Sequence, residues 1–126
     1  MPFTRISMIA GRTKSEKSGL VDDIYQALRS TFAVAENDRF MAINEYSEED
    51  FIFHPTYLEM NRSNRTVVIE IVCNNTRSVE QKKALYQDLA ARISKRLNIS
   101  ADEVVVCLVE VAKENWSMGR GLMSFA

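Results

Sequence analysis

The chain has 126 residues and a mass of 14.4 kDa, the size of one domain, which can bury roughly two-thirds of the surface that its unfolded chain exposes. A total of 16 Lys and Arg against 17 Asp and Glu gives a formal net charge of −1. We therefore expect no nucleic-acid surface and no binding to an anionic membrane, because both need concentrated positive charge.

No apolar run approaches the ~20 residues of a transmembrane helix, and the first residues lack the apolar core of a signal peptide, so we expect a cytoplasmic protein.

The residues point to no metal centre and to no cofactor. The chain has two cysteines, Cys73 and Cys107, and one histidine, His54. They cannot form a zinc-type ligand set without carboxylates. A histidine-dependent hydrolase would have to use His54, which stands beside a proline with no motif around it. The nearby Tyr57 has no motif either.

The first part of the chain predicts a strand, a helix and a second strand. Pro2–Met8 is a short run rich in β-forming residues. Thr13 and Glu16 then have the spacing of a capping box, in which a hydroxyl accepts the third helical N–H and the Glu side chain returns to the cap residue. After a turn, Arg39–Tyr46 predicts the second strand. Between them, apolar residues at helical spacing form one stripe that should face a core: Leu20, Ile24, Ala27, Leu28 and Phe32.

The same order of elements returns in the second half of the chain. Arg65–Cys73 is a strand with apolar residues at alternate positions. Ser78 and Gln81 repeat the capping box, and Glu103–Val111 predicts the last strand. The second helical stripe consists of Leu85, Leu89, Ile93 and Leu97.

The two halves align without a gap when one is shifted by 65 positions. We interpret the chain as a single domain, residues 1–126, with a unit at 2–46 repeated at 67–111, a linker at 47–66 and a tail at 112–126. Chance matching of amphipathic segments is the alternative. The matched pairs include Ile6 with Ile71, Arg12 with Arg77, Lys17 with Lys82 and Leu20 with Leu85.

The repeat predicts the fold class. A helix that joins two strands favours a right-handed βαβ crossover, with parallel pairing inside each unit. Two fused β-α-β units predict an α/β fold, a four-stranded sheet with both helices on one face. The other face of the sheet carries apolar residues, which predicts burial against other subunits in a homo-oligomer.

Pro2 is the first candidate for chemistry. A small second residue normally permits removal of the initiator methionine, and the chain would then begin with a secondary amine. A free α-amino group has a pKa of about 8, and desolvation or a nearby cation lowers that pKa. Pro2 would then be a rigid base that is neutral near physiological pH. If Met1 were retained, the same nitrogen would be an amide without basicity, and a proline also follows methionine by chance in many proteins.

Further residues carry a resemblance to a known family. Pro2 with Gly11-Arg12 and a capped helix resembles the N-terminal half of the 4-oxalocrotonate tautomerases, and Glu110–Ser124 resembles their C-terminal segment. The resemblance covers nearly the whole chain apart from the linker. The duplicated length is more similar still to the malonate semialdehyde decarboxylase branch of the tautomerase superfamily, which is matched at three short elements: Asp38-Arg39, Arg77-Ser78 and Asn115-Trp116-Ser117.

The resemblance implies roles for four residues. Pro2 matches the amino-terminal proline that serves as general base or acid. Arg77 matches the arginine that holds the substrate carboxylate and stabilises developing enolate charge. Trp116 matches an aromatic wall of the pocket. Asp38 matches the aspartate that keeps the proline protonated in the decarboxylase branch.

The duplication leaves two equivalent arginines but one free amine. The position of Pro2 is taken in the second unit by Val67, which is internal. In the family the proline of one unit works with the arginine of its partner unit. The resemblance therefore implies that Pro2 uses Arg77, whereas Arg12 faces a site without a base.

The implied activity is that of an isomerase, a cofactor-independent tautomerase of a small 2-oxo or 2-hydroxy-enoic acid, in a homotrimer. The decarboxylase branch carries a second arginine just before the Arg77 position, where this chain has Asn74, Asn75 and Thr76. That departure weighs against decarboxylation. A decarboxylase or hydratase of a small β-oxo acid, with Asp38 holding the proton on Pro2, is the first alternative. A non-catalytic trimeric ligand-binding module is the second.

Overall fold

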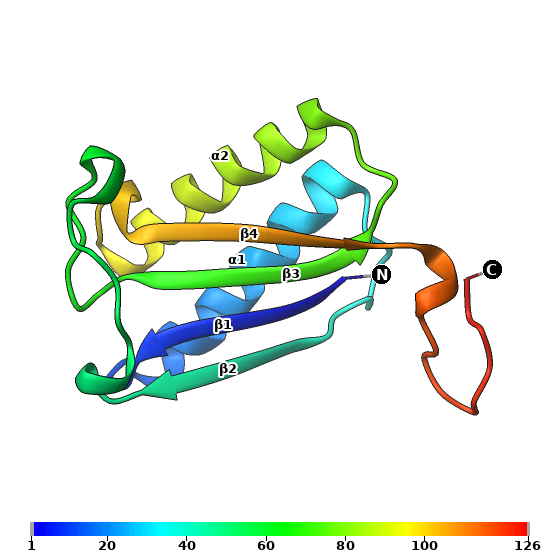
Figure 1. The fold of residues 1–126 in the computed structure, drawn as a ribbon, viewed down its shortest axis with the longest axis horizontal. Coiled ribbons are helices and arrows are strands. Elements are labelled where there is room, and N and C mark those ends of the chain that lie inside the picture. The colour runs from blue at the N-terminus through cyan, green and yellow to red at the C-terminus, as the bar shows by residue number, and fades with distance from the viewer. Residues whose placement is uncertain (1, 126) are drawn as a thin grey trace.

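The computed structural model describes residues 2–125, and the predicted α/β fold is confirmed (Figure 1). The strand ends differ from the predicted ones by one or two residues, and short 3-10 helices lie in the connections. No helix in the described part of the chain is long and apolar enough to cross a membrane. The main elements are β1 (Phe3–Ile9), α1 (Lys14–Phe32), β2 (Met41–Tyr46), β3 (Val67–Asn74), α2 (Val79–Leu97) and β4 (Val104–Val111).

The four strands form one mixed sheet in the order β2-β1-β3-β4. β1 pairs with β2 in parallel, and β3 pairs with β4 in parallel, as the crossover argument predicts. The two units meet through the antiparallel pair β1–β3, in which Ile6 lies opposite Ile69. The beginning of β1 and the end of β3 therefore lie at the same end of the sheet.

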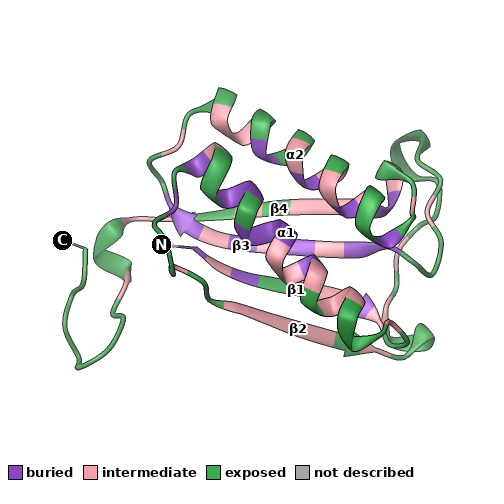
Figure 2. Ribbon diagram, turned by 180° about the vertical axis from the view of Figure 1, so that it is seen from behind, coloured by how far each residue is buried: buried purple, intermediate pink, exposed green. Residues whose placement is uncertain are grey.

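Both helices pack on one face of this sheet, and the core fills the space between the layers (Figures 1 and 2). The two apolar stripes face inward, toward alternate residues of β1 and β3, because removing apolar surface from water is the main driving force for packing. The fully buried large side chains are Ile6, Met8, Leu20, Ile24, Leu28, Ile69, Ile71, Leu85, Leu89, Ile93, Leu97 and Val67.

Both predicted capping boxes are present. The backbone N–H of Glu16 donates to the Thr13 hydroxyl at 3.1 Å, and the Thr13 N–H donates to the Glu16 carboxylate at 3.0 Å. Ser78 and Gln81 make the same pair of bonds at 3.1 and 2.9 Å. Each box satisfies two N–H groups that a helix start leaves unpaired, so both helices begin at a position fixed by the local sequence.

The repeat extends to side-chain interactions. Lys17 of α1 donates to Glu45 of β2 at 2.9 Å. The residues 65 positions later, Lys82 of α2 and Glu110 of β4, form the equivalent ion pair at 2.7 Å. The two units therefore share the way in which each helix is tied to its second strand.

The sheet face opposite the helices is covered by no helix of the described chain (Figure 1). Its charged side chains include Arg5 and Glu70, which pair across β1 and β3 at 3.5 Å. The remaining residues with this orientation are mostly apolar and include Phe3, Ile9, Tyr46, Val68, Val72, Val105, Val109 and Val111.

The second half of the linker is held by one buried carboxylate. Glu103 is 5% exposed and accepts bonds from the Ser63 N–H at 2.6 Å, from the Ser63 hydroxyl and from the Thr66 hydroxyl at 2.9 Å. Burial raises the pKa of Glu103, but the bonds from Ser63 and Thr66 and the charge of Arg12 together lower it by more, so its pKa lies below the ordinary value.

We expect Glu103→Gln to lower the free energy of unfolding by about 1–3 kcal/mol at pH 7, because the amide leaves these donors imperfectly matched. A carboxylate whose pKa is depressed by folding stabilises above its unfolded pKa of about 4.3 and loses that effect as pH falls through its folded pKa. The difference from wild type, measured by urea denaturation, should therefore shrink at pH 3. Glu36→Gln, in the exposed turn after α1, is the control, and an equal loss at both pH values would contradict the expectation.

Candidate active site

One end of the sheet collects the residues to which the sequence assigns chemistry. Phe3 lies opposite Val72, so Pro2 lies beside the end of β3, and β4 ends at the same side (Figure 1). The C-terminal tail projects from this side. Pro2 is buried. We call this region the Pro2 end of the sheet, defined by Pro2, Asn74 and Val111. Met1, on whose removal a free amine depends, lies outside the described residues.

Arg77 reaches the Pro2 end from the second unit. It follows β3 by a short turn and immediately precedes the cap of α2. Its Nη2 donates to the carbonyl oxygen of Phe32 at 3.2 Å, and its guanidinium carbon lies 5.0 Å from the Phe32 ring centroid. The carbonyl is at the C-terminal end of α1, where the helix dipole favours a cation. Because a guanidinium has five N–H donors, this contact fixes Arg77 and still leaves donors for a carboxylate.

Cys73 precedes this turn and is 1% exposed. Burial raises the pKa of its thiol, and the positive charge of Arg77 opposes that rise only in part. A thiol with a raised pKa remains protonated at neutral pH and is a poor nucleophile. Cys73 therefore serves as core packing beside the site.

Trp116 is attached to the same end by Asn74. The indole Nε1 donates to the Asn74 side-chain oxygen at 2.7 Å, and Asn74 is 7% exposed. Trp116 is half-buried and follows the short helix Lys113–Asn115. Sequence reasoning treated Asn74 only as a missing arginine and did not predict this bond. The available sign was an amide at the end of a mostly apolar strand.

Asp38 lies in the loop before β2, and this loop is tied to β1. The N–H of Thr4, two residues after Pro2, donates to the Phe40 carbonyl at 3.0 Å. The half-buried Asp38 is thus in the segment that runs alongside the beginning of β1.

Tyr25 of α1 supports the same loop. Its hydroxyl accepts the Asn37 N–H at 2.9 Å, and the Arg39 guanidinium carbon lies 4.0 Å from its ring centroid. The residues on both sides of Asp38 are therefore anchored to one buried aromatic side chain. Nothing in the local sequence around Tyr25 indicated this role.

Arg12 and Val67 lie at the opposite end of the sheet. Val67 begins β3 and is fully buried, and Arg12 donates from Nη2 to the Arg65 carbonyl at 2.5 Å. His54 and Tyr57 are exposed in the linker, where the His54 ring accepts the Thr56 N–H at 3.2 Å. The structure thus brings the four predicted site residues to the Pro2 end and separates the other candidates from them.

No three His, Cys, Asp or Glu side chains among residues 2–125 are grouped so that they can hold a metal ion.

Comparison with known proteins places this geometry in context. Two family models described as tautomerase enzyme match residues 38–119 and 2–61. The chain is 33% identical to probable tautomerase YusQ of Bacillus subtilis (strain 168) over 121 residues, covering 96% of this chain and 95% of the relative. It is 30% identical to probable tautomerase YrdN of the same organism, covering 99% and 96%.

Solved structures have the same fold. A malonate semialdehyde decarboxylase, described as having decarboxylase and hydratase activities, matches with a TM-score of 0.91 and 30% identity, covering 98% of this chain and 95% of that chain. A fused 4-OT, described as a symmetric trimer, matches with a TM-score of 0.81 over 95% of this chain and 94% of that chain. Its 20% identity shows a shared fold alone.

We expect Asn74→Ala to release the indole of Trp116, because the variant removes the acceptor of its N–H bond. Trp116 is the only tryptophan, so its fluorescence emission should shift to longer wavelength and acrylamide should quench it more strongly. Asn75→Ala is the matched control, since Asn75 is exposed and bonds to Val111 through its backbone only. Identical spectra for wild type and Asn74→Ala would show that the bond does not hold the ring.

Proposed function

Because the chain belongs to the tautomerase superfamily, we propose that it is a cofactor-independent tautomerase that moves protons on a small 2-oxo or 2-hydroxy-enoic acid. One observation carries the proposal. A buried proline just before β1 and an anchored arginine before α2 come from different units and lie at the same end of the sheet.

The proposed base is the Pro2 nitrogen, which requires that Met1 be removed. The neutral secondary amine takes the proton from the enol hydroxyl. The O–H electrons form the carbonyl, and the electrons of the carbon–carbon double bond accept a proton at the neighbouring carbon. The Pro2 ammonium supplies that proton and returns to the neutral amine. One rigid group thus acts first as base and then as acid.

Arg77 is the proposed carboxylate anchor. The contact with Phe32 holds its guanidinium in place before substrate arrives. A cation that is already oriented stabilises developing enolate charge without reorganising during the reaction. Paired N–H donors also match the geometry of a carboxylate.

Trp116 is the proposed apolar wall of the pocket. Its bond to the buried Asn74 fixes the ring at the end of β3. An apolar wall excludes water and so strengthens the interaction between Arg77 and the substrate carboxylate.

Asp38 would determine whether Pro2 works as a base or as an acid. A carboxylate near the amine stabilises the ammonium, whereas the Arg77 cation destabilises it. If the effect of Asp38 on the Pro2 amine outweighs that of Arg77, Pro2 stays protonated and acts as an acid. The protein would then have the alternative function, that of a decarboxylase or hydratase of a small β-oxo acid. The similarity to malonate semialdehyde decarboxylase supports this alternative. The residues just before Arg77 weigh against it, because Asn74, Asn75 and Thr76 stand where the decarboxylase branch carries a second arginine.

We also propose a homotrimer. No helix of residues 2–125 covers the apolar sheet face, and two structural neighbours of the same fold are described as fused 4-OT trimers. Burial of that face between copies would remove a large apolar surface from water.

The catalytic assignment predicts that Pro2→Ala lowers kcat/KM for phenylenolpyruvate by about 100-fold or more, since the base is removed. Arg77→Ala should lower kcat/KM with a rise in KM. Turnover is followed by ultraviolet absorbance on untagged protein whose intact mass is measured in parallel. Arg29→Ala removes a positive charge from the last turn of α1 and should leave turnover close to wild type. A mass that retains Met1, or turnover untouched by Pro2→Ala, would remove the amine from the mechanism.

The pH profile separates the two candidate reactions. Tautomerisation needs neutral Pro2, so kcat/KM should rise with pH as the amine loses its proton. Decarboxylation needs the ammonium, so its rate should fall over the same range. A fall for phenylenolpyruvate would be incompatible with Pro2 as the base.

A further inference from the structure

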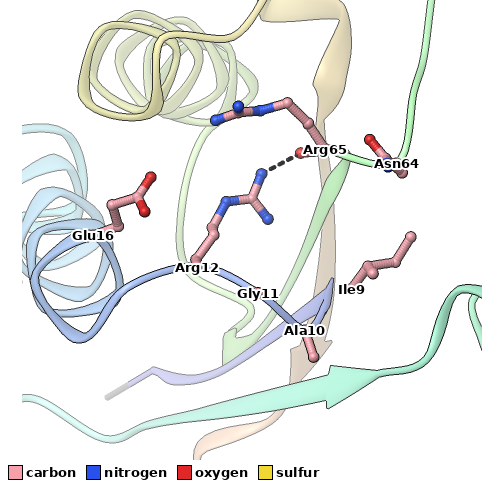
Figure 3. A pocket seen from close by; sticks show the side chains of 7 residues that line it. All are labelled: Ile9, Ala10, Gly11, Arg12, Glu16, Asn64 and Arg65. Carbon is pink, nitrogen blue, oxygen red and sulfur yellow. Dashed lines mark hydrogen bonds between the residues drawn. The ribbon is translucent and has the colours of Figure 1, made fainter.

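A cavity of about 220 Å³ lies at the end of the sheet opposite Pro2 (Figure 3). It occupies the space between the end of β1, the beginning of α1 and the segment that leads into β3. We call it the Arg12 cavity. Its lining consists of Ile9, Ala10, Gly11, Arg12, Glu16, Asn64 and Arg65.

The guanidinium of Arg12 stands in the middle of this cavity, with one bond to the Arg65 carbonyl (Figure 3). Its Nε is buried and has no hydrogen-bond partner. A buried N–H without an acceptor is costly and rare in native proteins.

A second guanidinium contributes positive charge. Arg65 also lines the cavity, and its Nη2 donates to the Leu97 carbonyl at 2.8 Å. Burial lowers the pKa of Arg12 and the charge of Arg65 lowers it further, while Glu16 and Glu103 oppose these effects only in part. Neither carboxylate forms an ion pair with Arg12 in the described chain. A bound anion would therefore stabilise both cations.

The internal repeat explains how this arrangement arose. Arg12 is equivalent to Arg77, and Leu97 is equivalent to Phe32, at the same separation of 65 positions. Arg77 bonds to the Phe32 carbonyl, but the corresponding Leu97 carbonyl is taken by Arg65. Arg12 is thus left with its guanidinium in the cavity.

Among the described residues, no amine base accompanies this cation. The position of Pro2 is occupied by Val67, whose nitrogen is an internal amide. The Arg12 end therefore retains the group suited to hold an anion and lacks the amine that is proposed to move a proton at the Pro2 end.

We propose that the Arg12 cavity is a non-catalytic binding site for a small carboxylate, held by the guanidinium of Arg12 with Arg65 as the second cation. The choice of a carboxylate rests on the proposed role of Arg77. The site itself rests on the cavity and the paired cations, Arg12 and Arg65. Its volume suits an acid of a few carbon atoms, and two parallel N–H donors match a carboxylate.

The test follows the side-chain Nε–H signal of Arg12 by 1H–15N NMR while pyruvate is added to the full chain. Arg12→Lys identifies the signal by its absence. We expect a saturable shift of this signal in wild type and in Arg77→Ala, with similar affinity for pyruvate.

Arg65→Ala and Asn64→Asp should each weaken the affinity for pyruvate about tenfold, the first by removing a cation and the second by adding an anion. Asn64 is exposed, and its substitution leaves both guanidinium groups in place, so this variant tests the site even if Arg65→Ala does not fold.

Several outcomes would overturn the proposal. One is an Arg12 Nε–H signal that does not move when pyruvate is added, and another is a signal that chloride moves as much as pyruvate does. A third is a signal that no longer responds to pyruvate in Arg77→Ala. A tighter response to inorganic phosphate than to pyruvate would show that the ligand class is wrong. If turnover proves independent of Pro2 while the Arg12 signal still saturates, the proposed function fails and this site stands.

Discussion

The antiparallel pairing of β1 with β3 is the constraint on which the rest of this structure depends. Each unit is a parallel βαβ element. The two units join through their first strands, β1 and β3, which run in opposite directions. The beginning of one unit's first strand therefore lies at the end of the other's. This geometry brings Pro2 of the first unit to the turn that carries Arg77 of the second, and it brings Val67 to Arg12 at the opposite end.

The two ends of the sheet have diverged from this common arrangement. At the Pro2 end, the arginine rests against the last residue of the neighbouring helix, Phe32. At the other end, Arg65 has taken the equivalent carbonyl, and Arg12 lies in a cavity with an unsatisfied Nε. A cation beside a free amine is suited to proton transfer, whereas a cation without one is suited to binding. The proposed function and the proposed binding site would thus give the two ends of one repeated fold different roles, proton transfer at one end and anion binding at the other.

The residues that support the candidate site lie mostly outside the motifs that indicate it. Asn74 holds Trp116, and Tyr25 anchors the residues on both sides of Asp38. Each support joins elements that are adjacent in space but separated along the chain. Such contacts restrict the orientation of site residues, which is what preorganised catalysis requires. Substitutions at these positions are thus as informative about the site as substitutions within it.

The sequence by itself determined the features that depend on neighbouring residues. Capping boxes at Thr13 and Ser78, two apolar stripes and the repeat at 65 positions were enough to predict the elements and the parallel pairing within each unit. These features are local, because helix caps and side-chain periodicity act within a few residues. Only the tertiary structure decided the order of the central strands, the bond from Trp116 to Asn74 and the capture of the Leu97 carbonyl by Arg65. Those interactions join segments far apart in the chain, and no local pattern determines which donor reaches which acceptor once the layers have packed.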